Sequence, residues 1–249
     1  MDESGIRTVD VRTVGVLGVG TMGAGIVQLA AQTGHEVVAC DSNVKALEKA
    51  QRYVREGLAR FTDRGAFSEE EAGEHYDRIH WTVNQEDMAE VGVAIEAIVE
   101  RVGPKKEAFA ALDEILPHDA LLLTNTSSIS ITDLASATKR PDRVCGTHFF
   151  TPPVREAVEV PRGLLTSDET VERVEALINS FGKVPVVLKK DVPGFVANRF
   201  LMPMLIEAAR LLEEGVASKE EIDLLVKKGI GFPFSSYTQT RAKVSRPAY

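Results

Sequence analysis

Residues 13–41 of this 249-residue chain read TVGVLGVGTMGAGIVQLAAQTGHEVVACD, and this stretch decides the fold. It opens on a β-branched apolar run, Thr13–Leu17, which is typical of a buried strand. The glycine cluster Gly18-Val19-Gly20-Thr21-Met22-Gly23 follows, then a helical segment and a second short strand at Glu36–Cys40. A glycine turn that joins a strand to a helix and leads to another strand predicts a parallel α/β sheet.

The glycine cluster has the spacing GxGxxG, and each position has a chemical use. Gly18 permits a tight turn, Gly20 lets a pyrophosphate approach the backbone, and Gly23 lets the helix pack on the strand. The start of the helix adds N–H groups and the positive end of its dipole, which favour phosphate. Asp41 can accept hydrogen bonds from ribose hydroxyls and would repel a 2′-phosphate. The stretch predicts NAD as cofactor, with a glycine turn that binds no nucleotide as the alternative. The predicted cofactor-binding residues are Gly18, Gly20, Thr21, Met22, Gly23 and Asp41.

The rest of the chain divides into two parts by its pattern of strands and helices. Short apolar strands continue to alternate with helices up to about residue 190, at 93–99, 121–124, 143–150, 157–160 and 184–188. This alternation predicts a doubly wound, Rossmann-type parallel sheet for residues 1–191. Two helices follow, at 195–212 and 218–228, with no strand after them. Residues 192–249 are therefore expected to form a small, incomplete all-α domain.

Composition excludes several classes of function. The chain has 29 Lys and Arg against 37 Asp and Glu, a net charge of -8, so general binding to nucleic acid or anionic lipid is disfavoured. Its apolar runs fall far short of the ~20 residues that span a bilayer. The two cysteines, Cys40 and Cys145, give no disulfide framework, and they fit a reducing cytoplasm. No metal site is expected.

Taken together, the motifs resemble the L-3-hydroxyacyl-CoA dehydrogenase family, which includes 3-hydroxybutyryl-CoA dehydrogenases. The resemblance runs through about residue 233, and its motifs occur in order at family-like spacing. The matching segments are VGVLGVGTMGAGIVQLAAQTGHEVVACD from Val14, IEAIVE from Ile95, TNTSSISIT from Thr124, HFFTPPVREAVEV from His148, DVPGFVANR from Asp191 and EAARLLEEGVASKEEID from Glu207. The resemblance implies hydride transfer between C3 of a hydroxyacyl-CoA thioester and NAD, in fatty acid or butanoate metabolism.

The resemblance also implies the catalytic pair. His148 matches the family's catalytic histidine, and imidazole suits removal of a hydroxyl proton near neutral pH. Glu159 matches the acid that pairs with it and would fix its tautomer. From the residues alone, His148 could be a structural histidine and Glu159 a surface residue on an edge strand.

Five further residues match functional positions of the family. Ser127 and Asn198 match residues that contact substrate; their alternatives are a helix N-cap before Ile129 and a capping Asn. Glu100 and Lys105 match positions around the nicotinamide ribose, although a surface lysine is nearly as good an interpretation. Arg64 matches a basic position that contacts the CoA nucleotide. Arg64 ends a basic helix face formed by Lys45, Lys49, Arg52, Arg60 and Arg64. An ordinary solvent-exposed helix face explains these basic residues equally well.

Two features depart from the family pattern. Thr151 stands where the family usually has Asn, so two amide donors are lost. After Phe232-Pro233 the usual C-terminal helices are absent, so the homodimer that the family suggests is doubtful. Two other functions are therefore weighed. One is a related β-hydroxyacid dehydrogenase that holds a free acid through Arg155 or Arg199. The other is an inactive, truncated nucleotide-binding protein.

Overall fold

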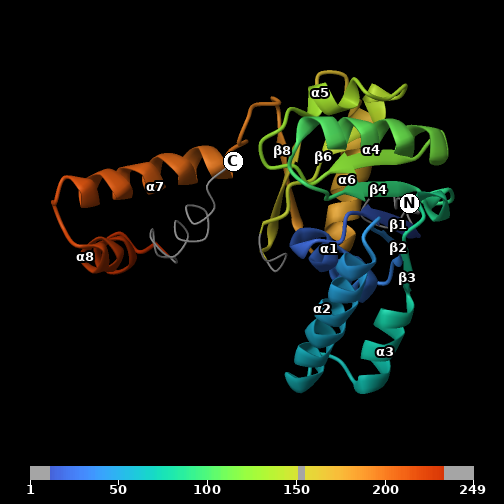
Figure 1. The fold of residues 1–249 in the computed structure, drawn as a ribbon, viewed down its shortest axis with the longest axis horizontal. Helices are drawn as coiled ribbons and strands as arrows, with labels where there is room; N and C mark the ends of the chain where they lie inside the picture. Colours follow the sequence, from blue (N-terminus) through green and yellow to red (C-terminus); the bar gives the residue numbers. More distant parts are fainter. Residues whose placement is uncertain (1–11, 151–154, 233–249) are drawn as a thin grey trace, which may run out of the picture. The chain divides into compact units, whose positions relative to one another are not determined.

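The computed structural model describes residues 12–150 and 155–232, and the chain divides into two compact units, Met1–Pro193 and Gly194–Tyr249. The described part of the first unit contains a six-stranded, all-parallel sheet in the order β3-β2-β1-β4-β5-β6 (Figure 1). The doubly wound parallel fold is thus confirmed. Its strands are β1 (Thr13–Leu17), β2 (Glu36–Cys40), β3 (Ile79–Thr82), β4 (Val93–Glu96), β5 (Leu121–Thr124) and β6 (Val144–Gly146).

The strand order creates a switch point between β1 and β4. From β1 the chain builds outward through β2 to β3, then returns to the other side of β1 with β4 and continues to β6. Because parallel crossovers are right-handed, the connections on the two sides of β1 lie on opposite faces of the sheet. Ligands of such sheets bind outside the carboxyl ends of the strands at the switch point. The fold therefore directs attention to the segments after β1 and β4.

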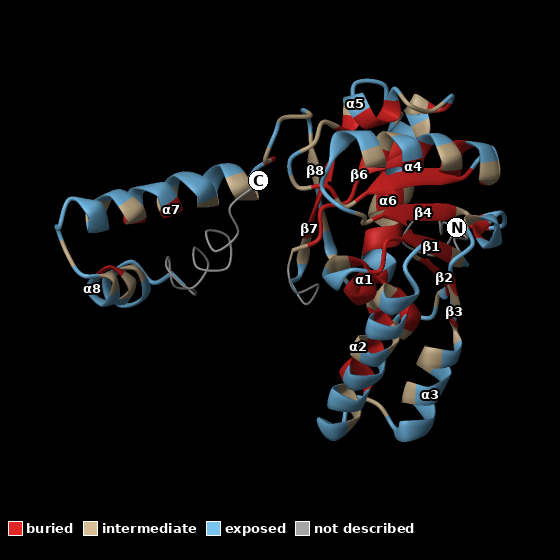
Figure 2. Cartoon of the chain, in the orientation of Figure 1, coloured by how far each residue is buried: buried red, intermediate tan, exposed pale blue. Residues whose placement is uncertain are grey.

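Helices cover both faces of this sheet, as Figure 1 shows for α1 and α4. The connecting helices are α1 (Thr21–Gln32), α2 (Val44–Asp63), α3 (Glu69–Asp77), α4 (Val102–Ile115), α5 (Ile131–Ala135) and α6 (Asp168–Ser180), with short 3₁₀ turns at Gln85–Met88 and Pro141–Arg143. Buried residues concentrate in the central strands and on the sheet-facing sides of the helices (Figure 2). Val16, Ile95 and Leu123 are completely buried, which explains why these strands read as continuous apolar runs.

Local sequence signals set several helix starts. Asn43 caps α2 by accepting a hydrogen bond from the Lys45 N–H. Ser68 and Glu71 form a capping box at the start of α3, with both reciprocal hydrogen bonds present. The N-cap of α5 is Ser130, so the interpretation of Ser127 as a helix cap is wrong.

The last strands depart from the predicted single sheet. β7 (Ala157–Pro161) and β8 (Val184–Leu188) form a separate two-stranded parallel sheet. The strand expected over 143–150 is shortened to β6, because the chain reverses and returns antiparallel. Isolated antiparallel bridges then join Cys145 to Arg162 and His148 to Glu159. The reversal ends parallel pairing and brings residues 11 apart in sequence face to face.

The second unit is helical in its described part. It contains α7 (Ala197–Glu213), α8 (Lys219–Leu224) and a π-helical turn at Leu225–Gly229. Ser218 and Glu221 form a capping box at the start of α8. None of the helices in the described part of the chain is long and apolar enough to cross a membrane.

Candidate active site

The glycine turn after β1 has the geometry that a bound pyrophosphate requires. Gly18 adopts φ +90°, where other residues are strained. A Cβ on Gly23 would lie 1.8 Å from the Gly18 carbonyl oxygen, so only glycine lets α1 pack this closely. A Cβ on Gly20 would meet no protein atom within 4 Å, because this position faces open space. The backbone at Gly20 is therefore accessible to a ligand, and the residues fit a dinucleotide.

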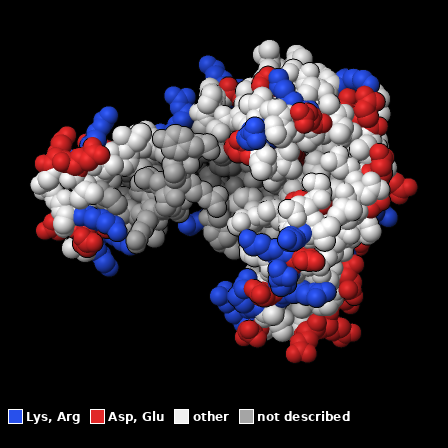
Figure 3. Space-filling model, viewed as in Figure 1, with Lys and Arg blue, Asp and Glu red and all other residues white. Residues whose placement is uncertain are grey.

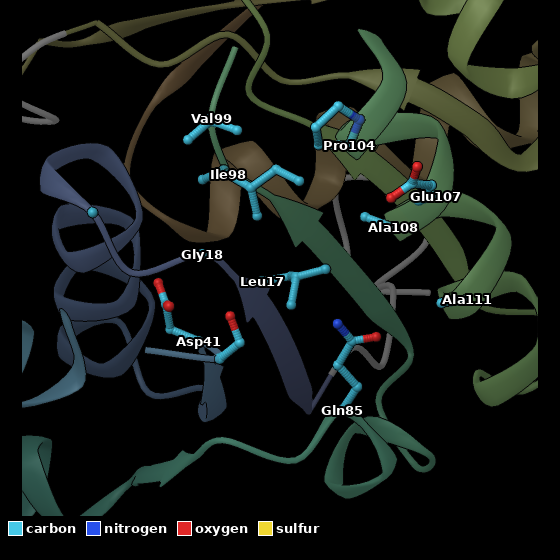
Figure 4. Close-up of a pocket in the computed structure, with 13 residues that line it drawn as sticks. Leu17, Gly18, Asp41, Gln85, Ile98, Val99, Pro104, Glu107, Ala108 and Ala111 are labelled. Carbon is cyan, nitrogen blue, oxygen red and sulfur yellow. The ribbon is translucent and has the colours of Figure 1, made fainter. Parts of the chain in front are cut away.

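A cleft of about 720 Å³ opens beside this turn at the predicted switch point. Figure 4 shows Asp41 on one side of the β1 end and Ile98 and Pro104 on the other. Thr21 is the exposed first residue of α1, whereas Met22 packs against the core. The residues that line the cleft include Leu17, Gly18, Gly20, Asp41, Ser42, Gln85, Ala97 and Val99.

Asp41 is fixed by backbone donors on both of its oxygens. The Val19 N–H donates to Oδ2 at 3.0 Å and the Asn43 N–H donates to Oδ1 at 2.9 Å. The carboxylate therefore ties the glycine turn to the end of β2. It is partly exposed at the cleft, where it can accept further hydrogen bonds from ribose hydroxyls.

A buried ion-pair cluster stands at the ends of β4 and β5. Lys105 is 1% exposed, and its Nζ lies 2.6 Å from Glu96 Oε1 and 3.3 Å from Glu100 Oε2. The alternative interpretation of Lys105 as a surface residue is therefore wrong. Glu96, which is completely buried, was not singled out by the sequence analysis. Its position in an otherwise apolar strand was the available signal, because a buried carboxylate requires partners.

Glu100 holds the turn that carries Ser127. Its Oε1 accepts hydrogen bonds from the Thr126 hydroxyl at 2.6 Å, the Ser127 N–H at 2.8 Å and the Ser128 hydroxyl at 3.1 Å. Burial alone would raise the pKa of Glu100. The Thr126 and Ser127 hydrogen bonds and the nearby Lys105 charge outweigh burial and lower it below the ordinary value. Glu100 is thus kept ionised as the acceptor that orders this turn.

His148 and Glu159 form a buried pair. His148 Nδ1 lies 2.7 Å from Glu159 Oε2, and both side chains are less than 10% exposed. The backbones of the two residues also exchange hydrogen bonds, at 2.9 and 3.2 Å. With Nδ1–H donating to the carboxylate, Nε2 carries the lone pair of the neutral ring. The Phe150 ring packs at 60° to the imidazole, with centroids 4.9 Å apart.

Asn125 connects the Ser127 turn to the His148 segment. Its Oδ1 accepts a hydrogen bond from the Phe149 N–H at 2.9 Å, and its own N–H donates to the Glu96 carbonyl at 2.8 Å. Asn125 lies within the TNTSS segment but was not among the predicted site residues. The ends of β4, β5 and β6 are thereby joined into one polar edge that carries Glu100, Lys105, Ser127 and His148.

Three further predicted residues, Arg64, Asn198 and Thr151, belong to other parts of the chain. Arg64 is the exposed C-cap of α2, where Lys and Arg gather with intervening acidic residues (Figure 3). Asn198 lies in the first turn of α7, in the second unit. Thr151 lies outside the described residues, so the effect of its replacing Asn remains a prediction.

Comparisons with known proteins relate the chain to one family of enzymes. Residues 13–192 match the model of the 3-hydroxyacyl-CoA dehydrogenase NAD-binding domain, and residues 194–240 match that of the C-terminal domain. The chain is 43% identical over 210 residues to a 3-hydroxybutyryl-CoA dehydrogenase of Clostridioides difficile, covering 84% of this chain and 74% of that protein. It is 41% identical over 220 residues to the mitochondrial hydroxyacyl-coenzyme A dehydrogenase of Sus scrofa, covering 86% and 70%. The crystal structure of (S)-3-hydroxybutyryl-CoA dehydrogenase from Ralstonia eutropha superposes with a TM-score of 0.89 at 40% identity, covering 94% of this chain and 83% of that one.

Proposed function

The chain belongs to the 3-hydroxyacyl-CoA dehydrogenase family, and from this premise we propose that it interconverts an L-3-hydroxyacyl-CoA and the 3-oxoacyl-CoA with NAD. A short acyl group, as in 3-hydroxybutyryl-CoA, is the proposed substrate, because the similar bacterial proteins carry that name. The observation that carries the proposal is the buried His148–Glu159 pair at 2.7 Å, on the same sheet edge as the glycine turn. An imidazole with a carboxylate behind it is suited to removing a hydroxyl proton.

The chemistry assigned to the chain's own residues follows from these contacts. NAD, when bound, supplies the hydride acceptor. His148 Nε2 takes the proton of the C3 hydroxyl, and Glu159 stabilises the imidazolium that results. The Ser127 hydroxyl can donate to the reacting oxygen as ketone or accept from it as alcohol, because a hydroxyl does both. Asn198 is proposed to orient the thioester with its amide.

One assay tests the function against the free-acid alternative. The full chain is mixed with NADH and either acetoacetyl-CoA or free acetoacetate, and the loss of NADH absorbance is followed. We expect oxidation of NADH with the thioester and at most a trace with the free acid. Equal turnover of both substrates would favour a β-hydroxyacid dehydrogenase, and NADH binding without turnover of either would contradict the proposed activity.

Arg64 gives a second prediction, on recognition of CoA. The net charge of the chain is -8, so attraction of CoA phosphates must be local, and α2 supplies exposed basic residues. We expect Arg64→Ala to raise KM for acetoacetyl-CoA by about threefold to tenfold, since one phosphate contact is lost. The KM for acetoacetyl-N-acetylcysteamine, which lacks the nucleotide, is the internal control and should not change. If the ratio of the two KM values is unchanged in Arg64→Ala, Arg64 does not contribute to CoA binding.

The division of labour between the parts of the chain is also a proposal. Residues 1–191 are assigned to NAD binding, and residues 192–249 to substrate contact and dimerisation. A homodimer is favoured by the large apolar side chains that α7 exposes, among them Phe200 at 81% and Ile206 at 51%. Cys40 and Cys145 are both buried free thiols, which fits a reducing compartment such as the cytoplasm.

A further inference from the structure

We propose that Glu96 is a positioning residue of this site: its carboxylate holds the buried Lys105 ammonium and sets the net charge beneath the dinucleotide. The inference rests on the proposed function, because it concerns the cofactor that this function requires. Glu96 ends β4 and is completely buried, at the end of an otherwise apolar strand. A charge retained in such a place needs an explanation.

Every contact of the Glu96 carboxylate is with a hydrogen-bond donor. Oε1 accepts from Lys105 Nζ at 2.6 Å and from the Ile98 N–H at 2.7 Å, and Oε2 accepts from the Thr124 hydroxyl at 2.7 Å. The Thr124 hydroxyl donates to Glu96 and accepts a hydrogen bond from the Thr126 N–H at 3.1 Å. Two oxygens that only accept are the pattern of an ionised carboxylate.

These contacts close into a ring of hydrogen bonds and one further ion pair. Lys105 bridges from Glu96 to Glu100 Oε2, and Glu100 Oε1 accepts from the Thr126 hydroxyl at 2.6 Å. Thr126 then leads back to Glu96 through Thr124. The ring ties together the end of β4, the first turn of α4 and the turn after β5 that carries Ser127. A shift of the Glu96 carboxylate is therefore transmitted to Ser127 through Lys105 and Glu100.

The position of the ring in the sheet relates it to the cofactor. The order β1-β4-β5-β6 puts the ends of β4 and β5 between the glycine turn after β1 and His148 after β6. A dinucleotide that joins the glycine turn to His148 spans this interval. Glu96 also fixes the wall of the cleft directly. Its carboxylate accepts a hydrogen bond from the Ile98 N–H, and Ile98 lies against Gly18.

The charge of the ring has a consequence for the redox state that binds. Two carboxylates and one ammonium leave a net charge of minus one, with Glu96 and Lys105 buried and Glu100 39% exposed at the edge of the cluster. The nicotinamide ring is cationic when oxidised and neutral when reduced, so the cluster favours the oxidised form. Glu96→Gln keeps the size of the side chain and makes the cluster neutral. The ratio of dissociation constants for NAD⁺ and NADH then rises by about fivefold, the effect of one partly screened unit charge.

Three variants separate charge from structure, and binding of NAD⁺ and NADH is measured by calorimetry after thermal melting has verified the fold. E96Q should raise the ratio of the two dissociation constants. The double variant E96Q/K105Q leaves only Glu100 charged, so it restores the net charge and returns the ratio to within about twofold of the wild type. E96D keeps the charge but shortens the reach to Lys105, so it leaves the ratio unchanged and lowers kcat by about tenfold.

Each result decides between the alternatives. A folded E96Q protein with the wild-type ratio, or a double variant whose ratio equals that of E96Q, overturns the electrostatic role. E96D with wild-type kcat overturns the positioning role, and E96D decides this point even if E96Q does not fold. A wild-type chain that binds neither dinucleotide contradicts the proposed function itself rather than the role of Glu96.

Discussion

His148→Gln lowers kcat for acetoacetyl-CoA reduction by about a thousandfold, within the range that a positioned general acid or base contributes. Glutamine has nearly the same reach as histidine and can still donate to Glu159, but it carries no group that exchanges a proton near neutral pH. The glycine cleft does not include residue 148, so affinity for NADH should stay within about twofold of the wild type. Stopped-flow turnover and NADH fluorescence titration measure the two quantities on the same sample.

Glu159→Gln is the matched control for this prediction. It keeps the imidazole and removes only the charge 2.7 Å from Nδ1, so the loss of kcat should be clearly smaller than for His148→Gln. If His148→Gln retains more than about a tenth of wild-type kcat, His148 is not the proton-transfer group. If Glu159→Gln is the more damaging change and lowers the melting temperature as well, the pair serves the fold.

The glycine turn could be predicted from sequence because its determinants are local. Gly18, Gly20 and Gly23 lie within six residues, and each has a conformational or steric reason that spacing reveals. The position of Asp41 follows equally from the length of one strand–helix–strand unit. Proximity in sequence and proximity in space coincide here, so little tertiary information is needed.

The His148–Glu159 contact could not be derived from the residues alone. It depends on the chain reversing after β6, which changes a predicted long parallel strand into an antiparallel bridge. The pair Pro152-Pro153 in this sequence predicts a turn, but neither that pair nor the alternation of apolar residues indicates where the strand ends or which residues come to face each other. The family resemblance brought His148 and Glu159 together in the prediction, and the structure places their side chains 2.7 Å apart.

Glu96 and Lys105 show why the burial of charged residues is difficult to predict from sequence. The sequence of residues 93–99 predicts one apolar strand, but β4 ends at Glu96. The Glu96 carboxylate accepts a hydrogen bond from the N–H of Ile98, two residues later in the chain. Lys105 follows Pro104 near a helix start, where lysine is usually solvated, but it is 1% exposed. Each of these two charged side chains can be buried only because the other charge is present. A sequence pattern that is read one position at a time does not show this mutual dependence.

Gly23→Ala should give the largest loss of stability among single changes in this site. The new methyl carbon would lie 1.8 Å from the Gly18 carbonyl oxygen and 2.9 Å from its carbon, both backbone atoms. Neither can rotate away, so α1 must move off β1 or the turn must open. We expect a loss of about 3 kcal/mol, the upper range for overpacking, and a fall in melting temperature of roughly 5–10 °C. Binding of NADH should weaken by more than about a hundredfold, because the N–H groups of the turn are displaced.

Gly20→Ala in the same turn separates ligand binding from folding. A methyl group there meets no protein atom within 4 Å, and the backbone, at φ -61°, is compatible with alanine. The melting temperature should therefore change by no more than about 3 °C, the cost of alanine at an N-cap. The methyl group nevertheless projects into the space from which a pyrophosphate would approach, so we expect at least a tenfold weaker affinity for NADH. If Gly20→Ala binds NADH as the wild type does while Gly23→Ala does not, the loss in Gly23→Ala reports unfolding of the turn. The dinucleotide would then lie elsewhere in the first unit.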